Sequence, residues 1–199
     1  MAGGKNIRAF LAIEPPDDIL SAVIGLQEKL RRVIKGKIAW TRAGSQHITL
    51  KFFGDVPAED IDAIGRSVQN RLQAGWSVNL KIAGLGLFPD ARKPRVLWCA
   101  AAGDVAKLAA LQKQLDNDFA PLGFAPETRP FRPHLTLARI REPQTVRGLN
   151  EALEGQADFF TGQFNVHELI LFQSRLRPEG ASYTKLAAFP LEPPGYGEK

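Results

Sequence analysis

One tetrapeptide pattern, His-x-Thr-Leu, occurs twice in this 199-residue chain and constrains its fold more than any other feature. The copies are His-Ile-Thr-Leu at 47–50 and His-Leu-Thr-Leu at 134–137. Each lies in a run rich in β-branched and aromatic residues, which is typical of a β-strand. Because residues i and i+2 of a strand share a face, each histidine projects beside its threonine while the intervening apolar residue projects into a core. The sequence therefore predicts two strands that each carry an outward-facing His-Thr pair.

Helices and strands are expected to alternate along the rest of the chain. Apolar residues at helical spacing predict helices, and alternating apolar and polar residues predict strands. The expected helices are 15–33, 59–72, 103–119 and 142–153, and the expected strands are 7–13, 38–41, 47–53, 78–83, 96–101, 131–139, 164–172 and 183–189. Gly and Pro predict turns or loops at 54–57, 84–94, 121–130 and 177–180. The loop at 84–94 is the expected junction between two halves of the chain.

The order strand, helix, motif strand, helix, strand occurs twice, once around each motif. This repetition predicts an α+β fold of two similar lobes related by a pseudo-twofold axis, each an antiparallel sheet with helices on its outer side. A central cleft would lie between the lobes, with one motif strand from each. We expect a single bilobal domain over 1–199, with interleaved lobes that correspond approximately to the sequence halves 7–90 and 91–189. The Pro/Gly-rich tail at 190–199 is expected to be loose.

Composition and charge are those of an ordinary globular protein. The chain is 44% hydrophobic and 24% charged, and its net charge of +5 is compatible with a phosphate-bearing partner without requiring one. No apolar run approaches the ~18 residues of a membrane span, and the short N-terminal run, interrupted by Arg8, does not resemble a signal peptide. We therefore expect a soluble, cytoplasmic, monomeric protein. The single Cys99 excludes an intramolecular disulfide, and its apolar neighbours predict a buried strand position.

Two of the three histidines of the chain belong to the repeated pattern. A single strand histidine beside a threonine is most simply structural, with its ring hydrogen-bonded to the hydroxyl. Repetition in two matching contexts favours a shared functional site instead. The third histidine, His167, has Leu169 rather than threonine two positions later, and we expect it to be a surface strand residue.

Two facing His-Thr pairs suit acid–base chemistry better than metal binding. Zinc sites use about three or four strong ligands, whereas threonine is a poor ligand and neither histidine is accompanied by cysteine or a carboxylate. Hydrolysis of a phosphodiester needs one group to accept a proton from water and another to donate one to the leaving oxygen, and imidazole does either near neutral pH. Threonine hydroxyls can donate hydrogen bonds to the phosphoryl oxygens. The pattern predicts a phosphoesterase that needs no metal or cofactor and has a bell-shaped pH profile around neutrality.

Beyond the motifs, segments from Ile7 to Phe189 resemble the 2H phosphoesterase superfamily, and specifically its bacterial and archaeal 2′-5′ RNA ligase branch, the RNA 2′,3′-cyclic phosphodiesterases. The matching segments are Arg-Ala-Phe-Leu-Ala-Ile (8–13), Trp40, His-Ile-Thr-Leu-Lys-Phe-Phe-Gly (47–54), Gly-Leu-Gly-Leu-Phe-Pro (84–89), Pro-Arg-Val-Leu-Trp (94–98), Phe-Arg-Pro-His-Leu-Thr-Leu-Ala-Arg (131–139), Leu-Phe-Gln-Ser-Arg-Leu (171–176) and Tyr183. The resemblance implies metal-independent hydrolysis of RNA terminal 2′,3′-cyclic phosphates, or of cyclic nucleotides, to a 2′-phosphate. It also raises reversible 2′-5′ ligation, for instance of tRNA fragments, as a second activity to test.

The resemblance further implies a role for each motif residue. His47 would be the proton donor to the departing 3′ oxygen, His134 the proton acceptor, and Thr49 and Thr136 would bind the phosphate. The near-symmetric residues alone leave open which histidine is the acid. Arg139 is implied as a substrate-binding residue, but it lies an odd number of positions after His134, so a straight strand would turn it to the opposite face. A bend in the strand, or the reach of its long side chain, is therefore required.

Two further groups of residues have both a functional and a structural interpretation. Basic side chains could guide RNA through counter-ion release or form a solvated surface; they are Arg42, Lys51, Arg92, Lys93, Arg129, Arg132 and Arg141. Aromatic side chains could stack on a nucleobase or belong to the core; they are Phe52, Phe53, Phe88 and Phe131. The alternative to an enzyme is a non-catalytic nucleotide- or RNA-binding module on the same scaffold, which would have no need of two intact histidines.

Overall fold

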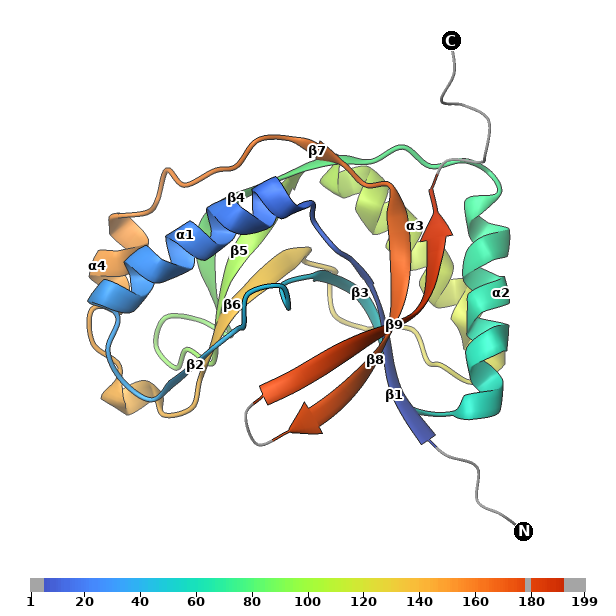
Figure 1. The fold of residues 1–199 in the computed structure, drawn as a ribbon, viewed down its shortest axis with the longest axis horizontal. Coiled ribbons are helices and arrows are strands. Elements are labelled where there is room, and N and C mark those ends of the chain that lie inside the picture. The colour runs from blue at the N-terminus through green and yellow to red at the C-terminus, as the bar shows by residue number, and fades with distance from the viewer. Residues whose placement is uncertain (1–5, 178–179, 192–199) are drawn as a thin grey trace.

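A strongly curled antiparallel sheet forms the centre of the computed structural model, which describes residues 6–177 and 180–191 (Figure 1). The strands are β1 (Asn6–Ile13), β2 (Ile38–Trp40), β3 (Ile48–Pro57), β4 (Asn79–Phe88), β5 (Val96–Gly103), β6 (His134–Ile140), β7 (Phe164–Asn165), β8 (Glu168–Arg177) and β9 (Gly180–Pro190). The helices are α1 (Asp17–Val33), α2 (Ile61–Leu72), α3 (Val105–Phe119) and α4 (Leu149–Glu154), with short 3₁₀ turns η1 (Ala58–Asp60), η2 (Ala120–Leu122) and η3 (Pro143–Thr145).

The two motif strands are neighbours at the middle of the sheet. The strand order is β7-β4-β5-β6-β3-β1-β8-β9, with β2 paired to β6 outside this path. β3 and β6 pair antiparallel at Ile48 and Leu135. The β3 side of this contact contains β3, β1, β8 and β9, from the two ends of the described chain, and the β6 side contains β6, β5, β4 and β7, from its middle, with β2 joined to β6. This arrangement confirms the predicted α+β class with two similar antiparallel halves.

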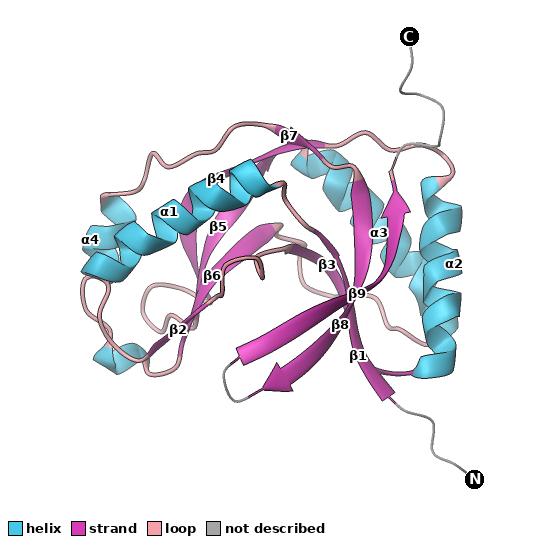
Figure 2. Ribbon diagram, in the orientation of Figure 1, coloured by secondary structure: helices cyan, strands magenta, loops and turns pink. Residues whose placement is uncertain are grey.

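Each half of the sheet is covered by a helix that follows a strand of the other half (Figure 2). α1 follows β1 but packs against the other half, where the Gln27 side chain donates to the Leu137 carbonyl of β6. α3 follows β5 and packs beside β3, where Gln112 donates to the Leu50 carbonyl. The ends of α1 suit a helix, because Asp17 and Asp18 lie in its first turn and two arginines in its last, which complements the helix dipole. Among the described residues, no helix is long and apolar enough to cross a membrane.

The core includes the residues that alternation along the motif strands turns inward, together with apolar residues of the helices and the other strands. Ile48, Leu135 and Leu137 are fully buried, and Leu50 is almost so. Cys99 is also fully buried, in β5, as predicted. Burial raises the pKa of its thiol to about 12, so the thiol stays protonated and unreactive at neutral pH.

Two predictions that took glycine as a sign of a turn or loop were wrong at least in part. The expected turn at 54–57 belongs to β3, and the first part of the expected loop at 84–94, from Gly84 to Phe88, is the end of β4. Gly54 and Gly84 have positive φ angles of 78° and 67° and lie at irregularities in the strand pairing. A Cβ atom at Gly86 would lie 2.1 Å from Cζ2 of Trp98, so this residue allows close packing of the indole rather than a turn.

Three other predictions needed correction or lie outside the described residues. The expected helix at 142–153 is broken into η3 and α4, because Arg147 pairs in extended form with Lys35 and Gly148 has a φ angle of 73°. His167 is exposed as predicted but lies in the break between β7 and β8, not in a strand. The predicted hairpin is formed by β8 and β9, although its tip at 178–179 and the tail at 192–199 lie outside the described residues.

Candidate active site

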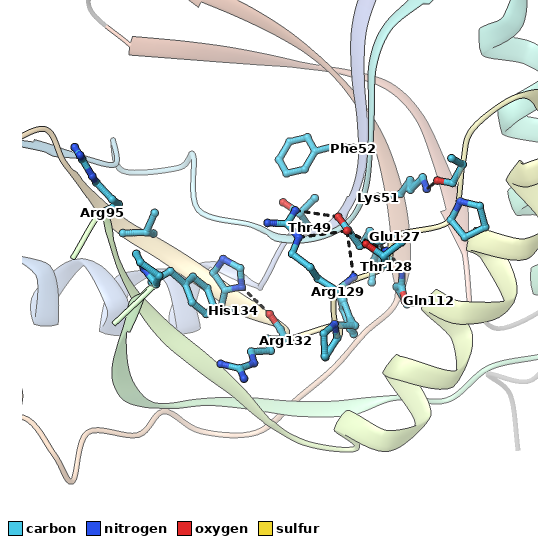
Figure 3. Close-up of a pocket in the computed structure, with 18 residues that line it drawn as sticks. Thr49, Lys51, Phe52, Arg95, Gln112, Glu127, Thr128, Arg129, Arg132 and His134 are labelled. Atoms are coloured by element: carbon cyan, nitrogen blue, oxygen red, sulfur yellow. Dashed lines mark hydrogen bonds and ion pairs between the residues drawn. The ribbon is translucent and has the colours of Figure 1, made fainter. Parts of the chain in front are cut away.

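The pairing of β3 with β6 brings the two His-Thr pairs together. With Ile48 opposite Leu135 in an antiparallel pair, the adjoining positions place His47 next to Thr136 and Thr49 next to His134. Thr49 and His134 both line one cavity of about 830 Å³, shown in Figure 3. We call the side of the two strands that carries these four residues the motif face.

Both histidines are held by the same hydrogen bond. Nδ1 of His47 lies 3.0 Å from the carbonyl oxygen of Ser45, and Nδ1 of His134 lies 2.7 Å from that of Arg132. Because a carbonyl oxygen only accepts hydrogen bonds, each Nδ1 carries the hydrogen. The remaining nitrogen of each ring, Nε2, is left to accept or donate a proton.

Aromatic side chains from β1, β4 and β9 contact both rings. Phe10 of β1 lies 4.6 Å from the His47 ring, measured between centroids, and Tyr183 of β9 meets it edge-on at 5.0 Å. Phe88 of β4 meets the His134 ring edge-on at 5.0 Å. These contacts limit the rotation of both imidazoles, which is the preorganisation that proton transfer at a fixed point requires.

Burial makes both imidazoles less basic than a free histidine. It lowers the pKa of His47 to about 4, against smaller opposing effects of the Ser45 carbonyl and the Glu14 carboxylate. It also lowers the pKa of His134, and the positive charge of Arg139 adds to this effect. Both rings are therefore neutral at pH 7 in the free protein. The positive charge of Arg139, and that of His134 when it is protonated, also lower the pKa of His47. All three residues therefore lie within electrostatic range of one another.

A β-bulge places Arg139 on the motif face. Thr136 lies opposite Trp98 of β5, but Ala138 lies opposite Leu97, so Leu137 is an extra residue without a partner in β5. Leu137 and Ala138 are consequently both buried, and Arg139 is exposed. The bulge is the bend that the sequence argument required, and it could not be located from the sequence.

The other motif strand has a matching bulge. Thr49 pairs with Ala12 of β1 and Lys51 with Leu11, which leaves Leu50 as the extra residue. The next outward-facing residue is Phe52, at the position that corresponds to Arg139 in the second motif. Its side chain is 61% exposed, and it lies over Thr49 at the edge of the cavity (Figure 3). Of the four phenylalanines considered for base stacking, Phe52 is the most exposed. Phe53 instead packs edge-on against Phe119 and Phe124 in the core.

The loop from 125 to 132 forms one wall of the cavity. It contributes Arg129 and Arg132, two of the basic residues considered for RNA binding, whereas Arg95 is a lining residue that the sequence argument missed. Arg129 is paired with Glu127 at 3.1 Å within the same loop. Arg95 follows Pro94 just before β5, in a segment that matches the family but to which the resemblance assigned no role.

Lys51, also considered for RNA binding, is not available for that role. Its ammonium forms a buried ion pair with Asp116 of α3 and donates to the Ala125 carbonyl at 2.6 Å. The second oxygen of Asp116 accepts the Glu127 backbone N–H at 2.6 Å. Lys51 therefore anchors the start of the cavity loop. Within the described part of the chain, no cluster of three or more His, Cys, Asp or Glu side chains is arranged to hold a metal ion.

The chain is similar in sequence and in fold to several known proteins. The RNA 2′,3′-cyclic phosphodiesterase of Methanothermobacter thermautotrophicus is 32% identical over 186 residues, which are 94% of this chain and 100% of that relative. The crystal structure of Escherichia coli LigT complexed with 3′-AMP superposes with a TM-score of 0.71 at 26% identity, covering 94% of this chain and 99% of that one. TT0787 of Thermus thermophilus shares the fold, with a TM-score of 0.77 at 24% identity over 93% of this chain and 98% of that one.

A model of the 2′-5′ RNA ligase superfamily matches residues 23–177, a span that includes both motif strands and the bulges that follow their threonines. The relative that is 32% identical over nearly the full length supports the same assignment. This chain belongs to the 2′-5′ RNA ligase superfamily.

Proposed function

We propose that this protein is a metal-independent phosphodiesterase that opens the terminal 2′,3′-cyclic phosphate of RNA and leaves a 2′-phosphate. The observation that carries the proposal is the matched anchoring of two histidines on paired strands, each with Nδ1 bonded to a carbonyl and Nε2 free. Membership of the superfamily and the names of the full-length relatives support the substrate class.

In the proposed reaction, the two imidazoles act on opposite sides of the phosphorus. Nε2 of His134 accepts a proton from water as its oxygen forms the new P–O bond, and Nε2 of His47 donates a proton to the 3′ oxygen as its bond to phosphorus breaks. The product has a 2′-phosphate and a 3′-hydroxyl. Thr49 and Thr136 donate hydrogen bonds to the non-bridging oxygens, and Arg139 offsets their negative charge. With an RNA 5′-hydroxyl in place of water, the same groups in the same roles would form a P–O5′ bond as the bond to the 3′ oxygen breaks, which is 2′-5′ ligation.

His47 must be protonated to act as the acid, although its pKa in the free protein is about 4. An anionic phosphate beside the ring favours its charged form and raises this pKa when the substrate binds. Glu14, whose carboxylate already acts in that direction, contributes to the same effect. We therefore expect the acid to gain its proton mainly in the substrate complex.

The pH profile tests this account. In the free protein, the pKa of His47 is about 4 and that of His134 is below 6.5, so kcat/KM should have a maximum on the acid side of pH 6.5. At a pH above this maximum, His47 loses the proton that it must donate. At a pH below it, His134 gains a proton and can no longer act as the base. The kcat profile, which reports the substrate complex, should be shifted to higher pH than the kcat/KM profile. A kcat/KM maximum at or above about pH 6.5, where two unperturbed imidazoles would place it, would contradict the electrostatics of the site.

The cavity beside Thr49 and His134 is the proposed site of the terminal nucleoside. Its volume of about 830 Å³ exceeds what a phosphate alone needs, and it presents an exposed phenyl ring and arginines to a base and its neighbouring phosphates. Replacing Phe52 with Leu should raise KM for a 2′,3′-cyclic nucleotide about tenfold through lost base stacking, with little change in kcat. Phe160, which is 71% exposed and lies outside the cavity, offers the matched control, since F160L should change neither constant.

Two assays with pure protein decide the proposed function. The first is incubation of RNA ending in a 2′,3′-cyclic phosphate with the protein in excess EDTA, and the second is identification of the product as a 2′- or 3′-phosphate. The proposal expects turnover that EDTA does not reduce and a 2′-phosphate product. Absence of turnover would favour a nucleotide-binding module, EDTA-sensitive turnover would overturn the metal-free mechanism, and a 3′-phosphate product would reverse the assignment of the leaving oxygen.

A further inference from the structure

A buried glutamine faces each motif strand from the helix packed against it. Gln27 of α1 is 3% exposed and Gln112 of α3 is 8% exposed. α1 follows β1 and α3 follows β5, so the two residues occupy corresponding helices in the two halves of the fold. A buried amide must be hydrogen-bonded to avoid a desolvation penalty that an apolar side chain would not have. The partners of these two amides are therefore informative.

Both glutamines donate to the bulged residue of a motif strand. Nε2 of Gln27 lies 2.8 Å from the carbonyl oxygen of Leu137, and Nε2 of Gln112 lies 3.4 Å from that of Leu50. These leucines are the extra residues of the two motif strands. Leu137 of β6 has no partner in β5, and Leu50 of β3 has no partner in β1. An extra residue in a strand interrupts the regular ladder of hydrogen bonds, so the bulge needs other partners.

The contact of Gln27 is the stronger of the two and has a second component. The same Nε2 also lies 2.8 Å from the Thr41 carbonyl oxygen, and the Thr41 backbone N–H donates to the Leu137 carbonyl at 2.8 Å. One amide group with two hydrogens thus joins the end of β2 to the bulge of β6. Neither an apolar side chain nor a carboxylate can donate both bonds.

The bulge decides which residue reaches the motif face. Without the extra residue at Leu137, Arg139 would lie on the opposite side of β6 from His134, because strand residues alternate between faces. With it, Arg139 is exposed and acts electrostatically on both motif histidines.

We propose that Gln27 is a positioning residue for Arg139: its buried amide holds the Leu137 bulge, and the bulge turns Arg139 toward the phosphate. Gln112 has the corresponding relation to Phe52 through Leu50, with a longer and weaker hydrogen bond. The inference rests on the proposed function in one respect, because it takes Arg139 to contact the phosphate and Phe52 the nucleobase. The structural part, control of the bulge by the glutamine, stands independently.

A double-mutant cycle tests the proposal in the full chain. Gln27→Met keeps the volume and removes both donors, and should lower kcat/KM for a 2′,3′-cyclic nucleotide about tenfold. In an Arg139→Ala background, the same change should have little further effect, because the residue that it positions is absent. A merely structural role would lower stability and activity equally in both backgrounds, so additive effects would overturn the proposal.

Gln112→Met is the matched control, since it removes the same kind of bond at the other motif. In an Arg139→Ala background, Gln112→Met should lower kcat/KM by its full amount. In a Phe52→Leu background, it should lower kcat/KM little further. If Q112M and Q27M instead changed kcat/KM in the same way in the R139A and F52L backgrounds, neither glutamine would act specifically through the residue assigned to it. The proposal would then be wrong.

A readout independent of activity separates this proposal from the proposed function. Nuclear magnetic resonance of the unmodified protein should show a scalar coupling across the hydrogen bond from Gln27 Nε2 to the Leu137 carbonyl carbon, and its absence would overturn the proposal even if Q27M failed to fold. In Q27M, the cross-strand contact of Leu97 with Ala138 should be lost or weakened, and an unchanged register with full activity would also overturn it. If R139A were fully active while Q27M shifted the register, only the role of Arg139 in phosphate binding would fail.

Discussion

Replacing either motif histidine with alanine should lower kcat/KM for a 2′,3′-cyclic nucleotide by about 10²- to 10⁴-fold, because each change removes one of two proton-transfer groups. The loss is expected at both His47 and His134, whose rings are held with Nε2 free. His167→Ala provides the control, since this exposed histidine lies outside the cavity and should be replaceable without loss. Retention of most activity in either motif variant would remove that histidine from the reaction.

The same variants can distinguish the acid from the base. A substrate in which sulfur replaces the 3′ oxygen has a leaving group that needs little protonation, so the general acid becomes dispensable. On this substrate, His47→Ala should recover most of the lost rate and His134→Ala should not. If only the His134 variant recovered, the two roles would be exchanged. His134 would then be the acid beside the leaving oxygen, and His47 the base beside the attacking water.

Replacing Asp116 with alanine should lower the free energy of unfolding by about 3–5 kcal/mol. Asp116 and Lys51 are 7% and 9% exposed at their side chains, so the change leaves a buried ammonium without its counter-ion. It also removes the acceptor for the Glu127 backbone N–H, which holds the cavity loop. Urea denaturation of both proteins gives the difference in stability, and KM should rise because the loop carries part of the nucleoside site.

Asp118, on the same helix, supplies the comparison for this prediction. It pairs with Arg71 at 2.6 Å, but the two side chains are 27% and 33% exposed, so water can replace the lost partner. Asp118→Ala should therefore cost only about 1 kcal/mol and leave KM unchanged. Equal losses of stability in the two variants would mean that burial of the Lys51–Asp116 pair has no particular importance for the fold.

The sequence contained enough information to predict the parts of the fold that depend on local periodicity. Alternation around His47 and His134 correctly predicted two strands with buried leucines or isoleucine between the polar residues. Helical spacing predicted α2 and α3 to within a few residues. The roles assigned to the motif residues in the reaction remain predictions that the experiments above address.

What the sequence could not provide depends on contacts between distant residues. The bulge at Leu137 is stabilised by Gln27, which is separated from it by 110 positions, and so the face on which Arg139 lies could not be derived locally. The sequence placed Gly86 in a loop, although a side chain is excluded there because it would collide with the Trp98 indole. That indole lies on another strand, so the collision could not be predicted locally. Lys51 was considered as an RNA contact for the same reason, since its partner Asp116 is on a distant helix.

A crystal structure of the protein with a bound 2′-nucleotide, the proposed product, tests the central claim most directly. The account predicts one phosphate between the two imidazoles, with Nε2 of His47 and Nε2 of His134 each within hydrogen-bond distance of different phosphate oxygens on opposite sides of the phosphorus. A phosphate bound to one histidine alone, or bound away from the motif face, would contradict it.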